Sequence, residues 1–278
     1  MIKSGLVGRN KVKIIMYLIV IGCSIGICFL GLRLNVSQQH QRKIEYAEET
    51  VRNEAVKIKQ LNNQVRTLYQ NDQEEFLIHP LEESSIVEVE EQIESLKSKA
   101  EDFGLKSKDF SMDTSDVVKS KQELVNKINQ IKNKSSIQNQ IAALLVDAPS
   151  DWATTADTVV INEKVTLQKI ERMRSEITGN TGVWHNAITI ILNEMDNQVK
   201  QYNELKQSIE RMIDGESLTN DATIENFILS FNQLELIKNT ILRKELTDKL
   251  ELIDKRLESH SAGIVPNGLQ EEIVPSSQ

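Results

Sequence analysis

A run of 19 residues without a charge, from Ile14 to Leu32, constrains this chain more than any other feature. A helix needs about 20 mostly apolar residues to cross the hydrocarbon core of a bilayer. The run is therefore predicted to be a transmembrane helix over residues 14–32. Four basic residues and no acidic residue precede it, and after Arg33 the next basic residue is Arg42. This bias predicts a cytoplasmic stub over residues 1–13 and an extracellular location for the rest of the chain.

Two kinds of signal sequence are alternatives to a retained transmembrane helix. A cleaved secretory signal has a shorter apolar region and a small-residue cleavage site, which does not follow this run. A lipoprotein signal fits better, because the segment VIGC (20–23) has the order of a lipobox and would place a lipid on Cys23. The apolar residues that continue after Cys23 favour the transmembrane helix, since a mature lipoprotein usually begins with a polar tether.

Small residues inside the run form a candidate helix-packing surface. Gly22 and Gly26 have G-x-x-x-G spacing, which lets a second transmembrane helix approach closely. A homo-oligomer formed through the transmembrane helix or the stalk that follows it is therefore one expectation. Cys23 and Cys28 are the only cysteines, so the outer part has no disulfide, as suits a bacterial cell surface.

Glycine and proline are scarce beyond the apolar run. Five of the 11 Gly lie in the first 31 residues, which leaves six Gly and all four Pro for the other 247 residues. So few turn-forming residues argue against a sandwich, a barrel or an α/β fold. The fold class is predicted to be all-α, with the transmembrane helix followed by tandem three-helix bundles that long shared helices join.

Helical periodicity and an internal repeat divide the outer part. Apolar residues at steps of three and four from Ile44 to Leu68 predict a helical stalk over residues 33–60. The segments LNNQVRTLYQND (61–72), IQNQIAALLVDA (137–148) and LKQSIERMIDG (205–215) resemble one another. They predict helical repeats over residues 61–134, 135–204 and 205–260, and chance likeness between amphipathic helices is the alternative.

Each repeat contains a second helix with a polar start signal. A capping box at Ser85, and polar residues at Asn162 and Thr219, are predicted to begin these helices. Residues 117–147 and 183–214 contain no Gly or Pro and are predicted to be long helices shared by successive bundles. The last helix is expected to follow a break near Asn239, and the tail over residues 261–278 is expected to be disordered.

Residue types that carry chemistry do not gather into any motif. The four histidines lie far apart without a second ligand at metal-binding spacing, so no metal, cofactor or catalytic residue is predicted and no enzyme is expected. Without the four basic residues before the apolar run, the chain has 29 basic and 41 acidic residues, a net charge of −12 that disfavours nucleic acid. Trp152 and Trp184 are candidates for surface recognition, with packing onto the bundle as the alternative.

The repeated unit, a helix that ends in a polar linker followed by a capped second helix and a third, resembles the extracellular helical repeats of the mid-cell-anchored protein Z family. These are single-pass division-site proteins of streptococci, enterococci and relatives, and the resemblance covers about residues 61–260. It implies an outward helical pedestal whose partners are envelope or division proteins, and the cell wall. The family's long cytoplasmic segment and its wall-binding domain have no counterpart in these 278 residues.

These observations together predict a non-enzymatic, membrane-anchored scaffold or spacer of a Gram-positive cell envelope, linked to division or wall assembly. The alternative is an accessory single-pass subunit of a secretion, conjugation or transport complex. In that case the transmembrane helix itself would bind the other subunits through Gly22 and Gly26.

Overall fold

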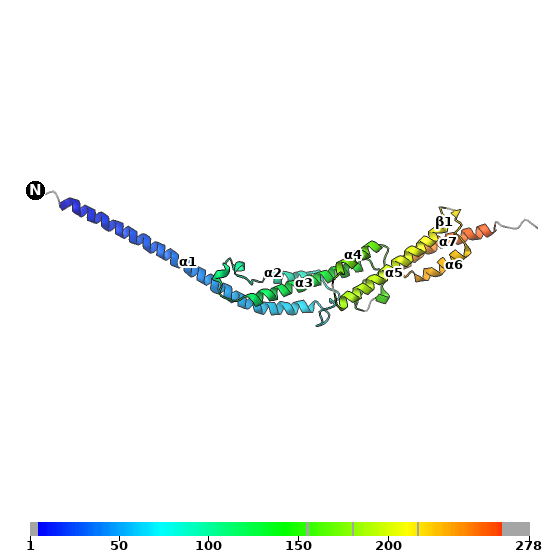
Figure 1. Cartoon of the computed structure of the whole chain (residues 1–278), viewed down its shortest axis with the longest axis horizontal. Helices are drawn as coiled ribbons and strands as arrows, with labels where there is room; N and C mark the ends of the chain where they lie inside the picture. The colour runs from blue at the N-terminus through cyan, green and yellow to red at the C-terminus, as the bar shows by residue number, and fades with distance from the viewer. Residues whose placement is uncertain (1–4, 154–155, 180, 216, 263–278) are drawn as a thin grey trace, which may run out of the picture. The chain divides into compact units, whose positions relative to one another are not determined.

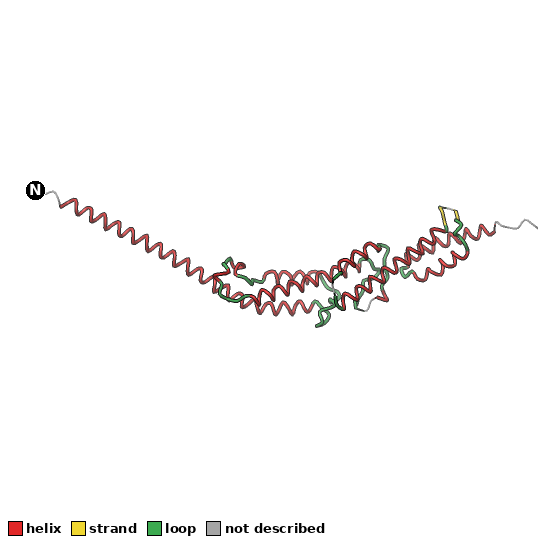
Figure 2. The backbone as a smooth tube through the Cα atoms, viewed as in Figure 1, coloured by secondary structure: helices red, strands yellow, loops and turns green. Residues whose placement is uncertain are grey.

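The computed structural model describes residues 5–153, 156–179, 181–215 and 217–262. Most of these residues are helical (Figure 2). The described strands are limited to β1 (Ile213–Asp214) and β2 (Ser217–Leu218), which form one short antiparallel hairpin. The prediction of a mostly helical chain is confirmed.

Helix α1 (Gly5–Thr67) is one continuous helix that includes the apolar run, the polar patch after it and the predicted stalk (Figure 1). Its apolar part reaches a mean hydropathy of 2.1 over 18 residues, and none of that window is buried. Within the described residues there is thus one helix, near the N-terminus, that is long and apolar enough to cross a membrane. The predicted stub is helical from Gly5 onward, and residues 1–4 lie outside the described part.

The chain divides into two compact units, of which unit 1 comprises residues 1–67 and 82–130. It contains α1, α2 (Glu83–Ser95), the 3₁₀ turns η1 (Ala100–Phe103) and η2 (Ser107–Asp109), and the first part of α3 (Ser115–Ala142). Helix α1 contacts α2 and η1. The predicted stalk is therefore part of a folded unit, because its apolar stripe supplies core residues, among them Ala47, Val51 and Ile58.

Unit 2 comprises residues 68–81 and 131–278. It contains the rest of α3, then η3 (Ala156–Thr158), α4 (Leu167–Ile177), α5 (Val183–Arg211), the β-hairpin, α6 (Ile224–Gln233), η4 (Leu234–Leu236) and α7 (Thr240–Ala262). Helix α5 contacts α4, α6 and α7, and α6 contacts α7, so these helices surround one core (Figure 1). The three repeats over residues 61–134, 135–204 and 205–260 stay a prediction.

The predicted start signals of the second helices are wrong by three or four residues. Helix α2 begins after Glu82, so Ser85 lies inside it. Helices α4 and α6 are capped by Thr166 and Thr223, whose hydroxyls accept hydrogen bonds from the backbone three residues on. Asn162 does not cap a helix. Its side-chain amide instead donates to the backbone carbonyls of residues 143 and 145, at 3.0 and 3.1 Å. Asn side chains commonly form such hydrogen bonds to nearby backbone outside helices.

The predicted break near Asn239 is confirmed. Helix α6 runs into η4, and α7 starts at Thr240 with the Asn239 side chain accepting from the N–H groups of Ile241 and Leu242 at 2.8 and 2.9 Å. This is an N-cap, which stabilises the free donors of the first helical turn. The predicted disordered tail lies outside the described residues except for residues 261 and 262, which belong to α7.

Candidate functional site

Helix α6 carries apolar side chains on its outer face as well as on its inner face. Ser230 is its buried residue, and Phe227 packs partly against the core of unit 2. Ile224 is 71% exposed and Phe231 is 55% exposed, and Ile228 and Leu229 are similarly open. Exposed apolar side chains that gather on one part of a surface commonly mark a binding site. The outer face of α6 is therefore the candidate binding surface of this unit.

Three of these side chains form a continuous stripe. Ile224, Ile228 and Phe231 stand at positions i, i+4 and i+7, which lie on one face of a helix over about 10 Å. We call these three residues the α6 stripe. The ring of Phe231 stacks on that of Phe227, with centroids 6.2 Å apart and planes 25° apart. This stacking holds the exposed ring in place beside the core.

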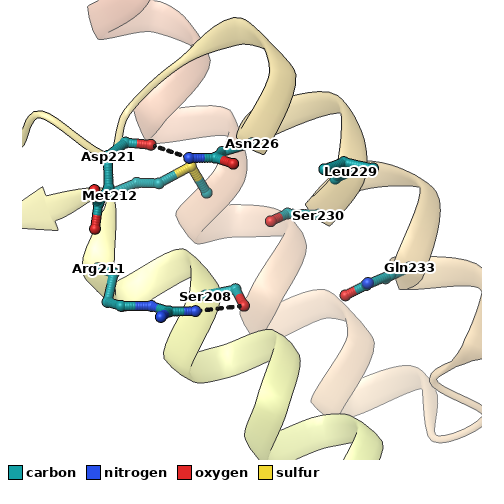
Figure 3. A pocket seen from close by; sticks show the side chains of 8 residues that line it. All are labelled: Ser208, Arg211, Met212, Asp221, Asn226, Leu229, Ser230 and Gln233. Atoms are coloured by element: carbon teal, nitrogen blue, oxygen red, sulfur yellow. Dashed lines mark hydrogen bonds between the residues drawn. The ribbon is translucent and has the colours of Figure 1, made fainter.

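A pocket of about 300 Å³ lies on another side of α6, where it meets the end of α5 (Figure 3). Arg211 extends along α5 toward Ser208, with Nη2 3.4 Å from the hydroxyl oxygen. Asn226 donates to the backbone carbonyl of Asp221 at 2.8 Å. The pocket therefore offers mainly polar groups, among them a guanidinium and two amides, and it is lined by Ser208, Arg211, Met212, Asp221, Asn226, Leu229, Ser230 and Gln233.

A second pocket, of about 260 Å³, lies between the linker at residues 161–167, α5 and α7. At its edge the Tyr202 hydroxyl donates to Oε2 of Glu245 at 2.8 Å, and Lys206 and Lys249 approach the other carboxylate oxygen at 3.5 and 3.6 Å. Burial of the phenol and its bond to this carboxylate raise the pKa of Tyr202 to about 12. The same bond, followed by the two ammonium groups, lowers the pKa of Glu245. At neutral pH Tyr202 is therefore neutral and Glu245 is ionised.

Two buried amides fix the linker that borders this pocket. Asn239, 2% exposed, donates to the carbonyl of Ile161 at 2.7 Å while it caps α7. Gln198 accepts from the N–H of Ile161 at 3.2 Å and donates to the carbonyl of Val159 at 2.8 Å. Both amides satisfy backbone groups that burial would otherwise leave without partners. Their arrangement indicates a structural role.

The two tryptophans predicted as recognition candidates are buried. Trp152 is 4% exposed and Trp184 is 2% exposed, and both belong to the core of unit 2, in agreement with the packing alternative. Lys134 lies 5.5 Å from the Trp184 ring and 5.4 Å from the Tyr69 ring, and it donates to the carbonyl of Glu75 at 2.6 Å. Desolvation lowers the pKa of Lys134. Neither indole therefore forms an exposed recognition surface.

The carboxylate of Glu75 binds the start of α5. It accepts from the N–H of Trp184 at 3.3 Å, where the helix dipole favours a negative charge. Gly182 precedes this turn with φ +116°, and a Cβ there would lie 2.8 Å from Oε1 of Glu75. Glycine is therefore needed both for the backbone conformation and for the close approach. The turn before α5 therefore depends on Gly182.

The predicted residues of the membrane helix lie on an open surface. An added Cβ at Gly22 or Gly26 would meet no atom within 4 Å, and Cys23 and Cys28 are exposed. Within the described part of the chain, no group of three His, Cys, Asp or Glu residues is placed to hold a metal ion.

The α6 stripe is the feature that sequence reasoning missed. Periodicity assigned Ile224, Phe227 and Phe231 to a helix, but it did not show that an apolar face stays open. The signal was the run FIL (227–229), which places apolar side chains on adjacent faces of one helix turn. No protein-family model, curated protein or solved structure matches the chain.

Proposed function

We propose that this chain is a membrane-anchored helical scaffold or spacer of a bacterial cell envelope, with its N-terminus in the cytoplasm and its helical units outside. One observation carries the proposal. The apolar window and part of the core of unit 1, including Ala47 and Val51, belong to the same helix, α1. A folded unit joined to its anchor by a continuous helix has no flexible linker between them.

The length of this junction can be estimated from the helix itself. From Leu32, at the end of the apolar run, to Ala47, the first core residue of unit 1, a helix rises about 22 Å at 1.5 Å per residue. The polar segment NVSQQHQRK (35–43) lies within this stretch and is helical. Such a segment would hold unit 1 at a set distance from the lipid head groups, which is what a spacer requires.

Tandem bundles joined by shared helices are a further part of the proposal. Helix α5 is unbroken over 29 residues, and its buried residues extend from Trp184 to Ile209. It contacts α4 as well as α6 and α7. These contacts are the ones that a helix shared by successive bundles would make. The link to cell division and to a Gram-positive wall depends on the resemblance to the mid-cell-anchored protein Z family.

The accessory-subunit alternative has an observation of its own. The open surface around Gly22 and Gly26 would allow a partner helix to approach the α1 backbone closely. Affinity isolation of the full chain from its native membrane separates the two functions. Envelope or wall-assembly proteins in variable amounts support the scaffold, and a fixed stoichiometry with transporter or secretion subunits refutes it.

The anchor itself is tested by lipid labelling. Cells that express the full chain are grown with a palmitate analogue, and the Cys23→Ser and Cys28→Ser variants serve as a matched pair. We expect no label that depends on Cys23 alone, because α1 is retained as a transmembrane helix. Label that is lost in Cys23→Ser and kept in Cys28→Ser would show a lipoprotein instead.

A further inference from the structure

We infer that the α6 stripe, Ile224, Ile228 and Phe231, is a contact surface between two copies of this chain in the membrane. The inference rests on the proposed membrane anchor, because that anchor confines the copies to one surface. It goes beyond the proposed function by assigning the surface and the occupant.

The low charge of α6 points to a second copy. The part of the chain beyond the N-terminal basic residues has a net charge of −12, so two copies repel each other over most of their surface. Helix α6 carries a single charge, Glu225, whereas its neighbour α7 carries ten charged residues in 23. The α6 stripe is therefore a place where like-charged copies can meet with little repulsion, and it offers no ion pair to a strongly charged partner.

The geometry of the stripe suits a symmetric contact. An isologous interface uses the same patch on both copies, so its central residue meets its own counterpart. Ile228 lies at the middle of the stripe, between Ile224 and Phe231. Ile228 therefore meets Ile228 of the second copy whether the two α6 helices run parallel or antiparallel. The stacked Phe227 ring supports Phe231 from behind and keeps the patch firm.

The exposed area of the α6 stripe indicates a weak contact that depends on how many copies of the chain share the membrane. Ile224, Ile228 and Phe231 together expose on the order of 300 Å², taking about 150 to 250 Å² for a whole large side chain. A stable interface needs about 800 Å² from each partner. The α6 stripe alone is too small for a stable dimer in dilute solution. Confinement to a bilayer raises the effective concentration of the second copy and compensates for the small area.

Cross-linking in vesicles tests this inference with the full chain. In a background of Cys23→Ser and Cys28→Ser, which removes both native cysteines, a single cysteine is introduced as Ile228→Cys. The protein is reconstituted into phosphatidylcholine vesicles and treated with a short bis-maleimide. We expect covalent dimers, with a yield that falls several-fold when the vesicles are diluted with lipid at constant protein. Leu252→Cys is the matched control, since Leu252 is an exposed apolar residue of α7.

A second substitution asks whether the stripe itself drives the contact. Adding Phe231→Glu to the Ile228→Cys variant places a charge in the patch, and we expect the dimer yield to fall about tenfold. Phe231 is exposed, so circular dichroism and tryptophan emission are expected to stay unchanged.

Three results would overturn the inference. Equal yields for Ile228→Cys and Leu252→Cys would do so, and so would a yield that Phe231→Glu leaves unaltered. In whole cells, cross-linking of Ile228→Cys mainly to a different protein would assign the stripe to another partner. The failure of the proposed anchor is distinguishable, because the chain would then be extracted from vesicles by alkaline carbonate before any cross-linking is measured.

Discussion

Replacement of Asn239 tests how unit 2 holds its linker against the helices. The side chain has two tasks in a site that is 2% exposed: its oxygen caps α7, and its amide N–H₂ donates to the carbonyl of Ile161 at 2.7 Å. Asn239→Ala removes both. We expect unit 2 to lose stability while its helices still form.

The magnitude follows from the two tasks. Loss of an N-cap typically costs about 0.5 to 2 kcal/mol. Leaving the buried carbonyl of Ile161 without a donor costs about 1 to 3 kcal/mol. The sum is about 1.5 to 5 kcal/mol, which lowers the melting temperature of a unit of this size by roughly 3 to 20 °C. Asn239→Ser keeps a capping oxygen and loses the donor, so it is expected to fall between Asn239→Ala and the native protein.

Tryptophan fluorescence is the assay, because the chain has two tryptophans and both are buried in unit 2. Urea and thermal unfolding of the full chain in detergent therefore report this unit. Asn232→Ala is the control, since Asn232 is an exposed residue of α6, and its effect is expected to stay within about 0.5 kcal/mol. If Asn239→Ala unfolds at the same urea concentration as the native protein, the assigned roles of this amide are refuted.

Three further predictions concern unit 2. Lys134→Met removes a half-buried cation from two backbone carbonyls and two aromatic rings, and we expect a loss of about 1 to 3 kcal/mol together with a change in tryptophan emission. Gly182→Ala is expected to lower the free energy of unfolding in urea by at least about 1 kcal/mol, because φ is +116° and the new Cβ would clash with Glu75. Adding Glu75→Ala to this variant should relieve the clash but not the backbone strain. The lowered pKa of Glu245 means that its interactions stabilise the fold above the ordinary value of 4.5 and are lost as the pH falls through the folded pKa. Tyr202→Phe should therefore lose less stability than the native protein between pH 6 and pH 3, and equal losses in urea titrations would contradict the role of the phenol.

Local sequence patterns predicted the long helices but not the contacts that fix them. The absence of Gly and Pro and the steps of three and four are sufficient to predict α3, α5 and the part of α1 after the apolar run, since both signals are local. The segment NDQEEFLIHPLE (71–82) was expected to be a polar linker. In the structure its Phe76 and Leu77 are buried, and Glu75 reaches the start of α5, 109 residues further along the chain. No periodicity within the segment carries that information, because the contact depends on where a distant helix begins.

The contrast between α4 and α6 shows what additional signal a sequence holds about a binding surface. Both are short, Thr-capped helices with an apolar stripe, so periodicity treats them alike. Helix α4 buries Ile170, Met173 and Ile177, and the rest of its surface carries Lys, Glu and Arg residues that remain solvated. Helix α6 has one charge, and its exposed surface carries the α6 stripe and uncharged polar residues where α4 has charged ones. Water solvates a charged face, whereas an apolar face is more stable when another surface covers it. Charged residues opposite the buried stripe therefore indicate a helix that packs only on its own core, and their absence indicates a helix that can bind a partner.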